Sequence, residues 1–330
     1  MLSRRPAYVP GLDGEAPLTL PTRRVLPGCM GRNALAALSP ELVARQEPLW
    51  TTPEHPVVCW PLHRGDPGPY YGGRHHSHPD MEAAVVLEGQ QELLYADSQL
   101  ECKPGDVWFA AAGEIHGFRS EGVTNICVAF GPSFLGDTTL GEHHWLAIFA
   151  HPPGERPRVT TAEQRSNVLG AGWQMYGEAA GKEAGWEAAI RIHLVQVLLT
   201  VARKWSPDQQ LSVTAGSMAA VVPAVEMVCS RSKVGGRVST LEAADACAMS
   251  RSHFCRTFRK SMGRSFGQFE LQSRLAVAAR LLRSTDLPVR DIAVQAGFWD
   301  HTHLDHVFVT HYGIGPRAFR SARAVPPERA

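Results

Sequence analysis

The chain has 330 residues, of which 44% are hydrophobic and 20% charged, with a formal net charge of +1. This length allows two domains, and the composition is ordinary for globular protein. The chain has no run of 18 apolar residues, so no membrane span is predicted, and the N-terminal residues lack the apolar core of a signal peptide. The seven cysteines are scattered and lack C-x-x-C spacing, which favours reduced thiols in the cytoplasm over a disulfide framework.

The charge is unevenly distributed along the chain. Residues 235–330 carry 14 Lys and Arg against 8 Asp and Glu, which leaves 19 against 24 for residues 1–234. An acidic first part followed by a basic second part is the pattern expected when only the second part binds a nucleic acid.

The predicted elements divide the chain into five parts. A Pro/Gly-rich N-terminal arm (1–50) has one short helical stretch at 33–46, and short apolar runs separated by turn residues predict strands over 51–135. Helices are expected over 136–205, most clearly at Thr160–Lys182 and Trp186–Trp205. A polar, aperiodic stretch predicts a linker over 206–217, and a helical domain follows over 218–323.

Residues within the predicted β-region have metal-ligand character. His76 and His78 are two positions apart, so on a strand both side chains face the same way. With Glu82 and His116 they offer three imidazoles and one carboxylate, a plausible set for Fe, Mn, Ni or Zn. The spacing of these residues and of the nearby glycines resembles the two motifs of the cupin barrel.

A divalent metal is one candidate occupant of this pocket, and an organic effector is the one we expect. In that interpretation His76, His78, Glu82 and His116 hydrogen-bond a small polar ligand, with Trp108 as an aromatic wall, and no metal is required.

The apolar stripe of Trp186–Trp205 fits packing against the β-region or against a second copy of the chain.

The C-terminal part contains one small module twice. Ala244–Phe258 and Ala293–Phe308 repeat with an offset of 49 residues in the first helix and 50 in the second. Two helix–turn–helix units in tandem suit a protein that reads two successive segments of DNA. Capping signals mark the helix starts. Capping boxes are predicted at Ser239 (S-x-x-E) and Ser265 (S-x-x-Q), single side-chain caps at Ser250 and Asp300, and a helix-starting proline at Pro288.

The second helix of the first unit has the character of a recognition helix. Ser252, Cys255, Arg256 and Arg259 share one face, whereas Phe254 and Phe258 point to the other. An Arg side chain can contact guanine with two hydrogen bonds, and Arg251, Arg259, Lys260 and Arg264 suit phosphates.

The second unit presents His301, Thr302, Asp305 and His306 on the equivalent face. Together with His303 and His311 these histidines also suggest a zinc site, although a zinc-binding helix needs its ligands on one face and an apolar shell. We expect the DNA-binding role.

Residues from Ser239 to Arg320 resemble the AraC/XylS family of transcriptional regulators. The resemblance rests on MSRSHFCRTFRK, Gly263–Phe266, Arg274 and Ala278, STDLPVRDIAVQAGF and GIGPRAFR, in that order. It implies an α+β multidomain fold, with an N-terminal cupin-type β-barrel and flanking helices and a C-terminal all-α double helix–turn–helix domain. It also places Ser252, Cys255 and Arg256, and then His301, Thr302 and His306, at base-reading positions.

The same resemblance implies a non-enzymatic, ligand-responsive homodimer that binds operator DNA and RNA polymerase, with a sugar or related compound as preferred effector. Where the family usually has basic residues, this chain has His306, Val309 and Thr310, so we expect the first unit to dominate affinity. A metal-dependent cupin enzyme with an appended DNA-binding domain is the main alternative function, and a nucleoid-type DNA-binding protein without effector is a third.

The segment G-R-S-F-G at 263–267 has the letters of the nucleophile-elbow motif. That motif needs a strand before it, whereas helices are expected on both sides here, so we interpret the match as coincidence.

Overall fold

The computed structural model describes residues 51, 55–62, 76–120, 122–205 and 214–321. The predicted N-terminal arm with its helix at 33–46 lies outside the described residues, as does most of the predicted linker. Among the helices of the described residues, none combines the length and apolar character needed to cross a membrane.

Seven antiparallel strands form two facing sheets. The strands are β1 (Val57–Leu62), β2 (Met81–Glu88), β3 (Gln91–Tyr95), β4 (Gln99–Cys102), β5 (Val107–Ala110), β6 (His116–Ser120) and β7 (Thr124–Phe130). One sheet has the order β1-β7-β2-β5 and the other β4-β3-β6. Alternate residues of β2 serve two cores: Ala84 and Val86 face the barrel interior, whereas Val85 and Leu87 belong to the core outside it. This explains why residues 83–87 of β2 are an uninterrupted apolar run.

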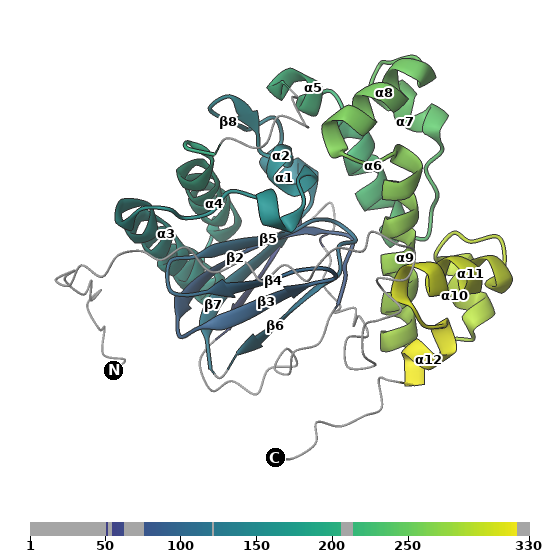
Figure 1. The fold of residues 1–330 in the computed structure, drawn as a ribbon, viewed down its shortest axis with the longest axis horizontal. Coiled ribbons are helices and arrows are strands. Elements are labelled where there is room, and N and C mark those ends of the chain that lie inside the picture. Colours follow the sequence, from purple (N-terminus) through teal and green to yellow (C-terminus); the bar gives the residue numbers. More distant parts are fainter. Residues whose placement is uncertain (1–50, 52–54, 63–75, 121, 206–213, 322–330) are drawn as a thin grey trace.

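Helices pack against the barrel and continue into the C-terminal domain. They are α1 (Pro132–Leu135), α2 (Leu146–Ala150), α3 (Ala162–Gly181), α4 (Trp186–Ala202), α5 (Ala215–Ala219), α6 (Val222–Lys233), α7 (Thr240–Ala246), α8 (Arg251–Met262), α9 (Phe266–Ser284), α10 (Val289–Gln295), α11 (His301–Tyr312) and α12 (Pro316–Ser321). The helices α3 and α4 lie on one side of the sheets and α6–α12 on another (Figure 1).

The long helix α3 forms despite its internal glycines, and one of them has a packing role. A Cβ on Gly172 would lie 2.7 Å from Cγ1 of Val85, so only glycine lets α3 approach β2 this closely. The stripe on α4 packs within the chain, where Ile190, Leu194 and Val197 are fully buried. The region 136–205 also holds a two-stranded hairpin, β8 (Thr139–Leu140) with β9 (His143–His144), which the sequence did not signal.

The predicted caps of the C-terminal domain are present, with two shifts in boundaries. Ser239 and Ser265 both form complete capping boxes, and Ser250 and Asp300 each accept a backbone N–H of the first turn. Pro288 is the residue before α10 and not its first residue. The helix α5 starts at Ala215, inside the stretch predicted as linker, because Thr214 caps it.

Candidate nucleic-acid interface and histidine cluster

The first candidate site is the exposed face of α8. Phe254 and Phe258 are fully buried against Phe266 and Phe269, which fixes the rotation of the helix. The predicted contact residues are accordingly exposed; they are Arg251, Ser252, Cys255, Arg256, Arg259 and Lys260. This face carries four cationic groups and no acidic side chain, so it is suited to a polyanion.

The second unit repeats this arrangement with different chemistry. Leu304 and Phe308 are buried, while His301, Thr302 and His306 are exposed. Asp300 accepts the backbone N–H of His303 at 2.8 Å and so begins α11 in the way that Ser250 begins α8. Within the described part of the chain, the group of His, Cys, Asp or Glu side chains with converging ligand atoms is in the cupin domain and not on α11.

That group consists of His76, His78, Glu82 and His116, all of them buried, with ligand atoms within 4.8 Å of one another. Glu82 is on β2 and His116 begins β6, and His76 bridges to His116 through two backbone hydrogen bonds. We refer to these four residues as the histidine cluster. The structure therefore brings together the four side chains that the sequence singled out as a set.

Hydrogen bonds orient two of the imidazoles. Nδ1 of His78 lies 2.9 Å from the carbonyl oxygen of Asp80, and Nδ1 of His116 lies 3.0 Å from that of Glu114. A carbonyl only accepts, so both Nδ1 atoms carry the proton and donate it. Both Nε2 atoms face Oε2 of Glu82, at 2.8 Å and 3.1 Å. In a neutral ring each of these atoms holds a lone pair, so a proton or a cation must lie between it and the carboxylate.

The electrostatics of the cluster follow from burial and pairing. Burial lowers the pKa of His78, but the hydrogen bond and the charge of Glu82 outweigh it, and the net pKa is raised. For Glu82 burial opposes ionisation, yet the hydrogen bonds from His116 and His78 hold its pKa well below the usual range. The cluster thus favours an anionic carboxylate that needs positive charge beside it.

Trp108 lies next to the cluster in the barrel interior, with its ring 6.0 Å from that of His116 between centroids. The indole is fully buried and its Nε1 has no hydrogen-bond partner among the residues that the structure describes. A buried indole N–H usually finds an acceptor, so this atom is a natural contact for a ligand oxygen.

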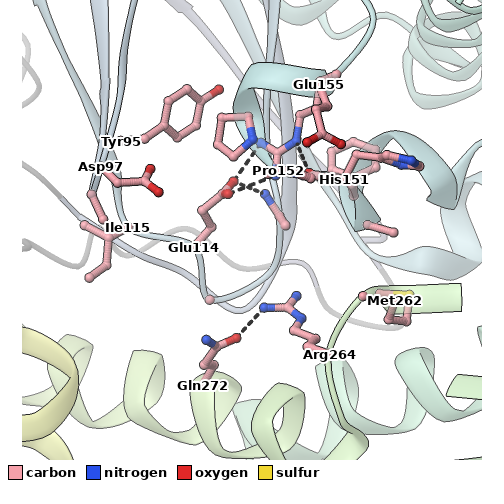
Figure 2. Close-up of a pocket in the computed structure, with 18 of the residues that line it drawn as sticks. Tyr95, Asp97, Glu114, Ile115, His151, Pro152, Glu155, Met262, Arg264 and Gln272 are labelled. Carbon is pink, nitrogen blue, oxygen red and sulfur yellow. Dashed lines mark hydrogen bonds and ion pairs between the residues drawn. The ribbon is translucent and has the colours of Figure 1, made fainter. Parts of the chain in front are cut away.

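A cleft of about 990 Å³ lies between the cupin domain and the helix–turn–helix domain. Figure 2 shows Tyr95 and Glu114 on the cupin side and Arg264 and Gln272 on the opposite side. Arg256, Arg259 and Lys260 of α8 also line this cleft. The helix α8 therefore turns part of its predicted DNA-contacting face toward the cupin domain.

Sequence reasoning did not predict this cleft: it missed Arg156 and Glu114, and it assigned Arg264 to phosphate binding and His311 to a possible zinc site, whereas the structure places both in the lining of the cleft. The guanidinium of Arg156 is buried and makes two 2.8 Å hydrogen bonds to the carboxylate of Glu114. On the other wall, desolvation lowers the pKa of Arg264 to about 10, and burial together with Arg264 lowers that of His311 to about 4. Arg156 is far from Glu114 in the sequence, and Arg264 is far from His311. No motif links the members of either pair, so the sequence did not predict these contacts.

Comparisons with known proteins agree with this architecture. A Cupin domain family model matches residues 62–130, and a Helix-turn-helix domain model matches residues 243–322. The HTH-type transcriptional activator RhaR of Cronobacter sakazakii is 21% identical over 86% of this chain and 97% of its own length. The Arabinose operon regulatory protein of Escherichia coli is 23% identical over 72% of this chain and 79% of its own.

Among solved structures, the DNA-binding domain of AdpA, in complex with a target DNA, is 30% identical and covers 32% of this chain and 98% of its own, with a TM-score of 0.30. The relatives are named as transcriptional regulators. This chain thus has a cupin domain followed by an AraC-type helix–turn–helix domain, and the relatives that it resembles over most of its length include AraC- and RhaR-type regulators.

Proposed function

We propose that this regulator reads two adjacent major-groove segments of double-stranded DNA, with α8 as the dominant recognition helix and α11 as the weaker one. The observation that carries this proposal is the face of α8, which exposes Arg256 and Arg259 while burying Phe254 and Phe258. Arg256 stands where a bidentate contact to guanine is possible, and Arg259 and Lys260 follow as phosphate contacts.

Selection of random duplexes with the full chain would supply the operator for a test. Arg256→Ala should weaken binding and relax the sequence preference at one position, whereas Lys260→Ala should weaken binding to all sequences alike. Glu242→Gln, on α7 away from this face, is the matched control. If Arg256→Ala left both affinity and sequence preference intact, α8 would not be the reading helix.

The histidine cluster and Trp108 form the proposed effector site. The cluster residues fit a divalent cation, because the lone pairs of His78 and His116 converge on an anionic Glu82 in a buried site. Bound there, a cation would supply positive charge and coordinate ligand oxygens. The effector class we favour is a sugar or related polyhydroxy compound, by analogy with the relative named for the arabinose operon.

Metal analysis of the purified chain, combined with thermal unfolding in the presence of sugars and sugar acids, tests this site. A ligand that binds only the folded state raises the midpoint of unfolding. His116→Ala should abolish the shift and preserve basal DNA binding. Turnover of a substrate that is lost in His116→Ala would instead support the alternative, a metal-dependent cupin enzyme.

The remaining parts of the proposal concern partners. We infer that the protein is a homodimer and that it acts on RNA polymerase at promoters. We place it in the cytoplasm, because its relatives are bacterial and bacterial DNA lies there. The stripe of α4 is occupied within the chain, so a dimer contact would use outward residues such as Ile192 and Trp173, which are 66% and 40% exposed. Sedimentation of the wild type and of Ile192→Glu tests this surface.

A further inference from the structure

The turn of the second helix–turn–helix unit is one residue longer than that of the first. In each unit a residue in the left-handed region begins the turn and a side-chain cap ends it; these are Ala248 and Ser250 in the first unit, and Gly297 and Asp300 in the second. Met249 alone lies between them in the first unit, whereas Phe298 and Trp299 do so in the second. Met249 donates its backbone N–H to the carbonyl of Ala244 at 2.9 Å. Phe298 donates to the equivalent carbonyl of Ala293 at 2.8 Å, so Trp299 is the added residue.

The side chain of Trp299 is directed to solvent. Its exposed fraction is 79%, whereas Phe298 beside it is buried in the core of the C-terminal domain and Met249 is partly buried in the first unit. Packing of the second unit therefore uses Phe298 and not Trp299. An indole offers a large apolar area at a low cost in conformational entropy, which suits an exposed one to contact with another molecule.

Arg237, from the segment between α6 and α7, covers this indole. Its guanidinium carbon lies 5.6 Å from the ring centroid of Trp299. A Cβ on Gly297 would lie 3.0 Å from Cγ of Arg237, so the stem of the arginine lies against the turn. Arg237 is exposed and forms no ion pair with any residue that the structure describes. A guanidinium that stacks through its face keeps the N–H groups of its edge available for an anion.

The helix α11 lacks cationic side chains of its own. Residues 301–312 contain no Lys or Arg, and Asp300 and Asp305 add negative charge. A helix–turn–helix unit takes its position on a duplex from contacts to phosphates, and α8 has four Lys and Arg side chains for that purpose. Arg237 supplies the charge that α11 lacks, at the place where Trp299 leads into the helix.

We propose that Arg237 and Trp299 form the phosphate contact of the second unit. The edge of the guanidinium binds a phosphate beside the segment read by His301 and Thr302, and the indole holds the guanidinium in place and covers the neighbouring deoxyribose. This proposal rests on the proposed function of α11 as the second recognition helix. A contact to the backbone reads no base, so the pair adds affinity and leaves the base preference unchanged.

Arg237→Gln is the first test, because it removes the charge and keeps the methylene groups that lie against Gly297. Binding of a selected fluorescent duplex near 0.1 M salt should become about 5- to 10-fold weaker, and the slope of log affinity against log salt should fall by about 0.9, the value for one phosphate. Arg119→Gln is the matched control, since this exposed arginine pairs with Glu92 inside the cupin domain. The control should alter neither quantity.

Trp299→Ala tests the platform separately from the charge. It should weaken binding by about 2- to 5-fold, the worth of an exposed cation–π contact, and Trp299→Phe should recover most of this loss because it restores a ring. The double variant of Arg237→Gln and Trp299→Ala should lose less than the product of the single effects, since the two side chains act on one phosphate. Unchanged midpoints of thermal unfolding would show that these exposed substitutions leave the fold intact.

A scan of the duplex with methylphosphonates, which replace one phosphate at a time by a neutral group, locates the contact. The wild type should lose affinity at one position in the segment bound by α11. Arg237→Gln should no longer respond at that position, whereas Arg256→Ala should still respond there.

The outcomes separate this proposal from the proposed function. If Arg237→Gln and Trp299→Ala bind like the wild type with the same salt slope, while Arg256→Ala binds more weakly, the phosphate contact is wrong and the DNA-binding function stands. If Arg256→Ala also has no effect, the assignment of the recognition helices fails as well. A weaker Arg237→Gln with an unchanged salt slope would mean that Arg237 supports the turn, which would also overturn the phosphate contact.

Discussion

The two helix–turn–helix units have nearly the same backbone and different surfaces. The second helices of the two units, α8 and α11, both have 12 residues, begin after a side-chain cap and end at a glycine in the left-handed region, Gly263 and Gly313. Fifty residues separate equivalent positions, so Phe258 corresponds to Phe308 and both are fully buried. Buried residues and caps determine the shape of a unit, and exposed residues are left to determine what it binds.

Removing the shared core should break both units equally and produce the largest effect. Phe258→Ala and Phe308→Ala should each lower the free energy of unfolding by about 3–5 kcal/mol, because each leaves a cavity among aromatic neighbours. Urea denaturation followed by circular dichroism measures this loss. A loss below about 1 kcal/mol in one unit would mean that its core is not packed as described.

The equivalent surface positions Arg256 and His306 should differ. Arg256→Ala should cost about 1–3 kcal/mol of binding to operator DNA, the worth of a bidentate base contact, and His306→Ala should cost less. Fluorescence anisotropy at one fixed salt concentration gives both values. Equal losses would contradict the dominance of the first unit.

Lys260 and Thr310 form another equivalent pair, and they sharpen the comparison through salt dependence. Lys260→Ala should reduce the slope of log affinity against log salt by about 0.9, the value for one phosphate contact. Thr310→Arg should increase the slope by a similar amount if α11 lies against the backbone as α8 does. An unchanged slope in both variants would place these positions away from phosphates.

The smallest expected effect concerns His311, which corresponds to the buried Ser261 of the first unit. Burial and Arg264 lower the pKa of His311 to about 4, so between that value and the ordinary value near 6.5 the unfolded chain binds more protons. Stability from His311 is present above about pH 6.5 and is lost as the pH falls toward 4. The midpoint temperature of thermal unfolding should therefore fall less steeply from pH 7 to pH 4.5 in His311→Asn than in the wild type. Parallel curves of midpoint against pH would rule out this contribution.

Much of the fold was predictable because its signals are local. A cap acts within one helical turn, and the phase of Phe254 and Phe258 is set by helical periodicity, so the helices and their buried faces follow from neighbouring letters. The spacing of His76, His78, Glu82 and His116 predicted a set of ligands, and strand geometry brings them together. The roles of these residues in binding DNA or a ligand remain predictions.

The sequence by itself determined the two kinds of domain, the helix starts and the candidate ligand set, because each depends on residues within a few positions or on a family motif. Only the tertiary structure decided how the domains dock. Ser77 and Tyr312 are 235 positions apart, and Arg156 meets Glu114 across 42. Contacts of this kind depend on the fit between two finished surfaces, which no period or spacing in the chain encodes.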